Sequence, residues 1–338
     1  MAKWIGVGLG VVLLAVAAAG YVLNSGAPAA PAGVCPALLS AAPLDANVVG
    51  YVDLASIRSP ELARQMGALE QSPQAAAYRD FVEKTNFHLD RDLDHLLFAG
   101  STESQGVALV LEGRFDQPRI SAFASNYASM RHYDAGDLYR FQSASPSQNA
   151  SMMFLGSSRL VFAAGRDADT QILMLADAAK GGGGAELHED LCSQAQRLAG
   201  APFFVLGDVP KTAVAQMTPV VSRQNPAAAE ILQSLRGWDM AYWMEGDNVR
   251  MAVEGEFDGR YDALQARFAF EKFRDTIDKA ETTWKAGQGA ANPGAPVLDA
   301  MVKNLAISID GRYVRMGTML KKSDIEKIVA ASGAAPPH

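Results

Sequence analysis

The stretch Val107–Asp116, VALVLEGRFD, is matched later in the chain by Val249–Asp258, VRMAVEGEFD. Five of the ten positions are identical, and the others include exchanges of one apolar residue for another. Each stretch has the alternation of a half-buried β-strand, ends at Glu-Gly and leads into a segment with helical periodicity. Because the same pattern occurs twice, the sequence indicates an internal duplication.

Two further pairs of segments match in the same order. VVGYVDL at 48–54 corresponds to FFVLGDV at 203–209, and each precedes a helix-like stretch. LGSSRLVFAAGRDADTQILM at 155–174 corresponds to IDGRYVRMGTMLKKSDIEKI at 309–328, where a strand ends and a helix begins. Three matches with similar spacing predict two tandem copies of one unit rather than a chance likeness.

The duplicated unit reads as strand, helix, hairpin, helix, hairpin, helix. Hairpins with helices between them predict largely antiparallel sheets with helices on one face, which is an α+β fold. A short connecting helix is expected at 188–198 and a long helix near 260–284. The expected elements of the first copy are a strand near 48–54, helices around 59–69 and 74–85, a hairpin of 96–101 with 106–113, a helix at 118–130, a hairpin of 151–156 with 159–164, and a helix at 167–179.

The N-terminal segment Trp4–Leu23 carries no charge and follows Lys3. As a helix it would span about 30 Å, the thickness of a bilayer's hydrocarbon core. With Lys3 on the cytoplasmic side, the positive-inside rule predicts one transmembrane helix at 4–23 and a body on the other side of the membrane. The alternative is a cleaved signal peptide, because Ala17–Ala19 offers a small-residue cleavage site, although the apolar run is longer than such peptides need.

The composition of the chain divides it into five parts. Residues 24–43 are rich in Ala and Pro and predict a semi-extended spacer. The predicted organisation is a cytoplasmic stub and anchor at 1–23, the spacer at 24–43, a first α+β repeat at 44–185, a connecting helix and second repeat at 186–331, and a disordered tail at 332–338.

Charge and cysteine content exclude several classes of partner. The net charge of −7 gives no electrostatic case for nucleic-acid binding. Two cysteines exclude a disulfide-rich scaffold and a four-cysteine zinc site. Cys35 and Cys192 form a candidate disulfide in an oxidising compartment. The opposing interpretation is that Cys192 is a small buried hydrophobe and Cys35 is free in the spacer.

Motifs for catalysis or metal binding are weak. The run His88–His95, HLDRDLDH, places acids at alternate positions as in a calcium loop, but it lacks the required glycine and the final glutamate. Glu112 and Glu254 occupy equivalent positions in the two copies and could act as acid and base, although equivalent repeat positions usually preserve structure. Trp243 could mark a ligand surface or lie under a helix. No catalytic, cofactor-binding or metal-binding residue is therefore assigned.

Three segments carry a resemblance to a known family. They are PLDANVVGYVDL at 43–54, RLVFAAGRDAD at 159–169 and APFFVLGDVP at 201–210. With these segments the chain resembles a family of uncharacterised bacterial envelope proteins, a domain of unknown function with an N-terminal membrane segment followed by strand–helix repeats. The resemblance covers most of residues 43–331 and implies no activity, cofactor or catalytic residue.

The leading hypothesis from the sequence is a single-pass bacterial inner-membrane protein whose body lies on the periplasmic side. The missing catalytic motifs favour a non-enzymatic module that binds an envelope protein or an apolar ligand. The alternatives are an envelope enzyme whose catalytic residues are dispersed in the sequence, and a structural subunit of an envelope complex.

Overall fold

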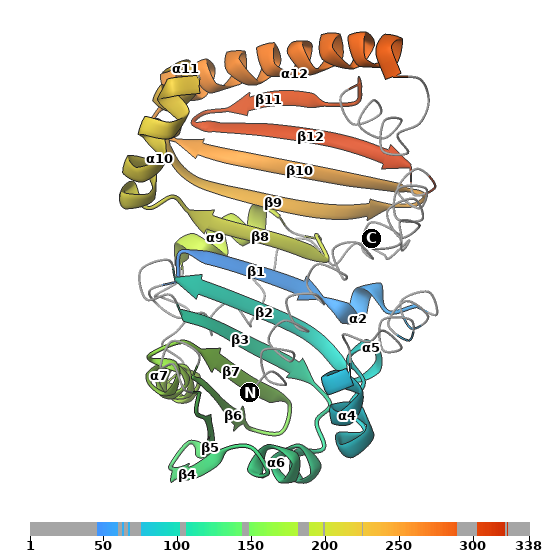
Figure 1. Ribbon diagram of the computed structural model, residues 1–338, viewed down its shortest axis with the longest axis vertical. Helices are drawn as coiled ribbons and strands as arrows, with labels where there is room; N and C mark the ends of the chain where they lie inside the picture. Colours follow the sequence, from blue (N-terminus) through green and yellow to red (C-terminus); the bar gives the residue numbers. More distant parts are fainter. Residues whose placement is uncertain are drawn as a thin grey trace. The chain divides into compact units, whose positions relative to one another are not determined.

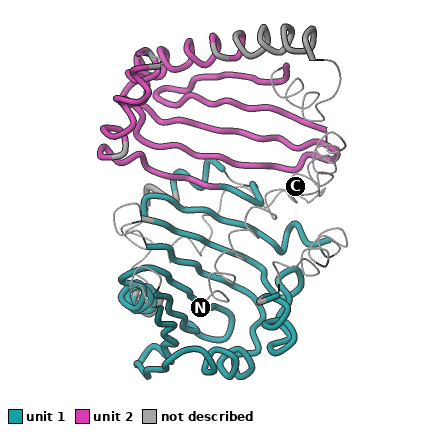
Figure 2. The backbone as a smooth tube through the Cα atoms, viewed as in Figure 1, with its two compact units in different colours: residues 1–204 teal, residues 205–338 magenta. Residues whose placement is uncertain are grey.

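The computed structural model describes residues 46–59, 63, 67, 76–101, 106–143, 149–181, 189–198, 200–224, 226–288, 303–321 and 323. The predicted anchor, spacer and tail lie outside these residues, and so does nearly all of the predicted helix at 59–69. The chain divides into two compact units, residues 1–204 and 205–338, and the division falls within a strand (Figure 2).

Unit 1 holds an antiparallel sheet with the strand order β1-β2-β3-β7-β6-β5-β4 (Figure 1). Its elements are β1 (Val48–Asp53), α2 (Leu54–Ile57), α4 (Ala76–Thr85), α5 (Leu89–Asp92), β2 (Leu93–Ser101), β3 (Gly106–Gly113), α6 (Gln117–Ser125), β4 (Ser129–Tyr133), β5 (Gly136–Phe141), β6 (Ala150–Leu155), β7 (Arg159–Ala164), α7 (Ala168–Gly181) and α9 (Glu189–Arg197).

Unit 2 has the strand order β8-β9-β10-β12-β11, with β9, β10, β12 and β11 paired antiparallel. Its elements are β8 (Phe203–Asp208), α10 (Lys211–Gln224), α11 (Pro226–Ser234), β9 (Leu235–Glu245), β10 (Asn248–Phe257), α12 (Arg260–Gln288), β11 (Ala306–Asp310) and β12 (Tyr313–Lys321). The predicted α+β fold with largely antiparallel sheets is therefore confirmed.

Helices lie on both faces of the unit 1 sheet, whereas the sequence predicted one face. Ser151 of β6 bonds to Asp169 of α7, so α7 covers the face to which Ser151 points. Phe154 points to the opposite face and meets Phe115, which stacks on Phe87 near the ends of α4 and α6. The sequence of β3 explains why both faces of this sheet are covered by helices. Ala108–Leu111 is buried on both faces, and a strand buried on both faces has a continuous run of apolar residues.

One hairpin was not predicted. The helix expected at 118–130 ends at Ser125, and the strands β4 and β5 follow it. Asp116 caps the start of α6 by accepting a hydrogen bond from the Arg119 N–H, and proline follows in the first turn. β4 escaped detection because four of its five residues are exposed, so it shows no apolar alternation.

The core of each unit is formed where helices meet the sheet. In unit 1, Val110 and Val161 are at most 1% exposed and lie on the face that α7 covers, together with Ile172 of α7. In unit 2, Phe257 and Val314 of the sheet pack with Ala263 and Ala266 of α12. Small residues on α12 let the helix approach the strands closely.

We predict that an added side chain destabilises the protein more at Gly113 than at Gly255, the glycines that follow Glu112 and Glu254. A Cβ at Gly113 would lie 2.2 Å from the Asp92 carbonyl oxygen, whereas at Gly255 it would meet only side-chain atoms of Phe257 and Leu235 at 3.1 Å or more. Gly113→Ala should cost about 1–3 kcal/mol of unfolding free energy, because backbone must move. Gly255→Ala, the matched control, should cost clearly less. Equal losses in urea unfolding of the two variants would contradict this packing.

Candidate functional site

Glu112 and Glu254 each form an ion pair with an arginine on a neighbouring strand. In unit 1, Glu112 of β3 lies opposite Arg159 of β7, and Arg159 Nε is 3.2 Å from Glu112 Oε1. In unit 2, Glu254 of β10 lies opposite Arg315 of β12, and Arg315 Nη2 is 2.8 Å from Glu254 Oε2. Of the two roles considered from the sequence, these contacts match a structural one, because each carboxylate is engaged by an arginine on the neighbouring strand.

The two pairs differ in their exposure to solvent. The Glu112 side chain is 29% exposed, whereas that of Glu254 is 6% exposed. On the other side of Glu254, the register of β9 places Asp239, which is 3% exposed. Two carboxylates on neighbouring strands repel each other unless a cation is close. Loss of Arg315 should therefore destabilise unit 2 more than loss of Arg159 destabilises unit 1.

In unit 1, residues of two further strands lie in line with Glu112 and Arg159 across the sheet. His95 of β2 lies opposite Glu112, and Asp53 of β1 lies opposite His95. The Tyr51 hydroxyl is 2.9 Å from His95 Nδ1, and Asp53 Oδ1 is 3.6 Å from the same nitrogen. Burial raises the pKa of the Tyr51 hydroxyl, and the charges of Asp53 and Glu112 raise it further. Tyr51 is therefore protonated at neutral pH and can donate a hydrogen bond.

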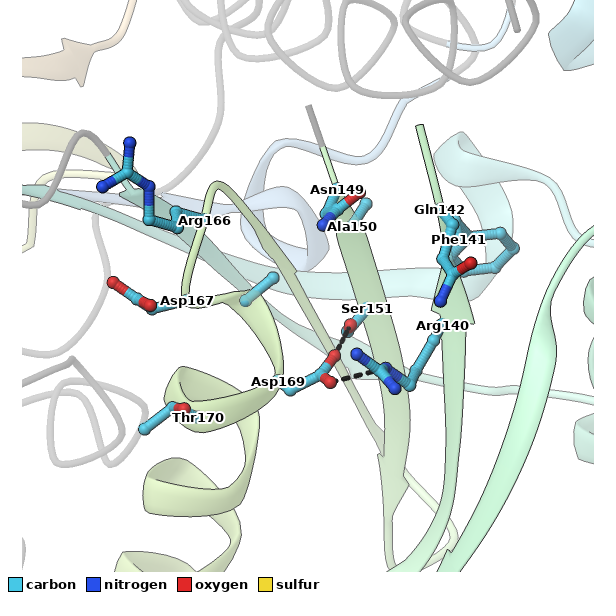
Figure 3. A pocket seen from close by; sticks show the side chains of 11 residues that line it. Arg140, Phe141, Gln142, Asn149, Ala150, Ser151, Arg166, Asp167, Asp169 and Thr170 are labelled. Atoms are coloured by element: carbon cyan, nitrogen blue, oxygen red, sulfur yellow. Dashed lines mark hydrogen bonds and ion pairs between the residues drawn. The ribbon is translucent and has the colours of Figure 1, made fainter. Parts of the chain in front are cut away.

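A pocket of about 150 Å³ lies in unit 1 at the start of α7 (Figure 3). Asp169 in the first turn of α7 accepts a hydrogen bond from the Ser151 hydroxyl, and its Oδ2 is 2.5 Å from Arg140 Nε. Figure 3 shows Arg166 and Asp167 on the opposite side of Asp169 from Arg140. The pocket is lined by Arg140, Phe141, Gln142, Asn149, Ala150, Ser151, Arg166, Asp167, Ala168, Asp169 and Thr170.

The acidic run between His88 and His95 does not converge on a single point. Asp92 accepts a hydrogen bond from the His88 N–H at 2.9 Å and a bidentate contact from Arg91, while Asp94 pairs with Arg58. Partial burial favours the neutral form of Asp92, but the hydrogen bonds from Arg91 and His88 outweigh it and hold the pKa of this carboxyl below its usual range. These contacts fix the short helix α5 ahead of β2.

Within the residues that the structure describes, no group of three His, Cys, Asp or Glu side chains is placed to hold a metal ion. Trp243 is 7% exposed and the Arg250 guanidinium lies 4.3 Å from its ring centre, so the interpretation of Trp243 as an open ligand surface is wrong. Cys35 lies outside the described residues, and Cys192 lies in α9 without a described side chain, so their disulfide stays a prediction.

Two parts of this arrangement escaped the sequence analysis. The contact of Tyr51 with His95 joins strands that are 44 residues apart, and neither residue belongs to a recognisable motif. The pocket combines β5, β6 and the start of α7, and β5 belongs to the unpredicted hairpin. The one available signal was the RDAD run at 166–169, which places acids at a helix start.

Comparison with known proteins gives only distant likenesses. No protein-family model matches the chain, and no curated protein matches it. A solved structure described as crystal form III of TP0453 matches with a TM-score of 0.44 and 10% identity, covering 87% of this chain and 97% of the other. Crystal form IV of TP0453 matches with a TM-score of 0.44 and 10% identity, covering 88% and 96%.

We predict that the arginine of the repeated pair matters more in unit 2. Arg315→Gln removes the arginine that contacts the buried Glu254 at 2.8 Å and should cost about 2 kcal/mol of unfolding free energy. Arg159→Gln leaves Glu112 partly solvated and should cost less than about 1 kcal/mol. Urea unfolding of both variants provides the comparison, and a larger loss for Arg159→Gln would refute the burial argument.

A second prediction concerns alkaline pH. An unfolded tyrosine titrates near about pH 10, whereas the pKa of Tyr51 is raised in the folded chain. The unfolded state therefore binds fewer protons above that pH, and the stability from Tyr51 is complete below about pH 10 and is lost as the pH rises towards the folded pKa. The native protein should lose unfolding free energy faster between about pH 9.5 and 11 than Tyr51→Phe does. If the unfolding free energies of the native protein and of Tyr51→Phe fell in parallel with pH, Tyr51 would ionise as easily in the folded chain as in the unfolded one, and the prediction would be wrong.

Proposed function

We propose that this chain is a membrane-anchored protein of the bacterial envelope whose body is a non-enzymatic binding module built from two copies of one α+β unit. The observation that carries the binding role is the pocket at the start of α7, because charged and polar side chains from β5, β6 and α7 line it together.

The strand orders support the two-copy proposal. The segment β1-β2-β3-β7-β6 of unit 1 parallels β8-β9-β10-β12-β11 of unit 2, and each pair of matched segments falls on corresponding strands. In both units a register shift leaves one extra residue near the start of the equivalent strand, Asp94 in β2 and Arg236 in β9. Together with the repeated Glu–Arg pair, these features give the copies the same internal register.

The hairpin of β4 and β5 supplies one wall of the pocket. It lies between α6 and β6, and Arg140 and Gln142 at its end line the pocket. In unit 2 the stretch 289–302, between α12 and β11, lies outside the described residues.

The envelope location is proposed from the apolar segment at 4–23 and the spacer at 24–43. None of the described helices has the length and apolar character needed to cross a membrane. The segment at 4–23 is outside the described residues, so the anchor rests on its uncharged length and on Lys3.

One observation favours the enzyme alternative. Tyr51, His95 and Asp53 are in contact, and a tyrosine–histidine–carboxylate group is chemically able to move a proton. The pocket that we describe is lined by other residues, so these three groups do not face it.

The alternative of a structural subunit is supported by a different surface of the molecule. Large apolar side chains on α10 and α12 are at least half exposed, as a docking surface would require. They are Met217, Val220, Tyr261 and Phe268.

The topology can be tested directly. A C-terminal fusion to a reporter that is active only outside the cytoplasm should be active, because residues 24–338 follow the anchor to that side. The matched control lacks residues 4–23 and should give activity only with a cytoplasmic reporter. Activity of a cytoplasmic reporter on the intact chain would overturn the envelope assignment.

A further inference from the structure

His95 of β2 lies beside two groups of β1 that compete for the same ring nitrogen. The Tyr51 hydroxyl is 2.9 Å from His95 Nδ1, and Asp53 Oδ1 is 3.6 Å from it. A neutral imidazole carries one proton, so only one of its two nitrogens is an acceptor. The Tyr51 hydroxyl is protonated at neutral pH and donates to Nδ1, which places the proton of neutral His95 on Nε2.

The hydrogen bond from Tyr51 satisfies a buried hydroxyl. Tyr51 is 8% exposed, and among the described residues its hydroxyl has no second hydrogen-bond partner. The Asp53 carboxylate has a different partner, because its Oδ1 accepts a hydrogen bond from the Ser56 N–H at the start of α2, 2.9 Å away. In the neutral state of His95, Nδ1 is therefore bonded to Tyr51 and Asp53 caps the helix.

Protonation of His95 reverses the role of Nδ1. Both ring nitrogens of an imidazolium are donors, so Nδ1 can no longer accept from the Tyr51 hydroxyl. Hydrogen bonds between ionised partners are roughly twice as strong as neutral ones. The new N–H therefore bonds to the Asp53 carboxylate, 3.6 Å away, in preference to the neutral Tyr51 oxygen. Imidazole is the side chain that changes its charge between about pH 5 and 8.

The other charged groups around His95 have partners of their own. Glu112 of β3 lies opposite His95, but Arg159 of β7 engages its carboxylate at 3.2 Å. Helix α2, which packs on β2, carries no titratable side chain, and Arg58 beyond its end pairs with Asp94. The His95 side chain is 31% exposed, so a proton can reach the ring from solvent.

We propose that His95 is a pH-dependent switch that exchanges one hydrogen bond for another. Neutral His95 accepts a hydrogen bond from the Tyr51 hydroxyl, and protonated His95 donates one from the same nitrogen to the Asp53 carboxylate. The exchange couples the proton to the start of α2, because Asp53 then shares its carboxylate between His95 and the Ser56 N–H. The switch lies within unit 1 and does not depend on the proposed binding role or on the proposed location.

The test is a pair of double-mutant cycles, measured by urea unfolding of the full-length chain in detergent at about pH 8 and about pH 5. In the cycle of Tyr51→Phe with His95→Ala, the coupling should change the unfolding equilibrium constant at least about threefold at the higher pH and less than about twofold at the lower. In the cycle of Asp53→Asn with His95→Ala, the larger coupling should appear at the lower pH. Asparagine is as good a helix N-cap as aspartate, so Asp53→Asn keeps the start of α2.

His132 and Asp137 provide a matched control. Their side chains lie 2.8 Å apart, and the His132 side chain is 83% exposed. The coupling between His132→Ala and Asp137→Asn should stay below that of the Asp53 cycle at the lower pH, because solvent screens an exposed pair. Equal coupling at both pH values in either His95 cycle would overturn the switch.

Nitrogen NMR of the His95 ring in the unmutated chain decides the matter if His95→Ala does not fold. The ring proton should lie on Nε2 alone at the higher pH and on both nitrogens at the lower one. A proton on Nδ1 at the higher pH, or a ring that stays neutral at the lower one, would refute the proposal.

Discussion

The register of one central strand in each unit governs most of the described structure. In an antiparallel sheet, a slip of one residue turns every side chain of a strand to the opposite face. In β3 such a slip would still bury apolar residues, because Ala108–Leu111 is apolar throughout. The Glu112–Arg159 contact at the end of the strand removes that ambiguity, since a slip would move Glu112 away from its arginine. Glu254 and Arg315 do the same for β10.

The sequence predicted the elements whose pattern depends only on neighbouring residues. Hairpins β2–β3 and β6–β7 lie where alternation and turn signals placed them, and α12 begins at the expected Arg260. β4 was missed because its side chains lie at an exposed edge, where no burial imposes a period of two. The placement of helices on both faces was missed because a short apolar run does not reveal how many faces it covers.

Function-related contacts were harder to foresee than strands. Glu112 and Glu254 were predicted to occupy equivalent positions, but their arginine partners lie on another strand and could not be paired by local spacing. The pocket depends on β5, which was not predicted, and on Asp169, whose role is to hold Arg140 and Ser151 together. Long-range contacts of this kind follow from topology, so they become visible only when the strand order is known.

The central claim is that the same cross-strand Glu–Arg contact organises both units. Double-mutant cycles with charge reversals measure it directly, using Glu112→Arg with Arg159→Glu in unit 1 and Glu254→Arg with Arg315→Glu in unit 2. Each reversed pair should be more stable than the sum of its single reversals predicts, by about 0.5–3 kcal/mol, with the larger coupling in the buried unit 2 pair. A coupling energy of zero in either unit would show that the contact does not hold that strand in register and would contradict the account.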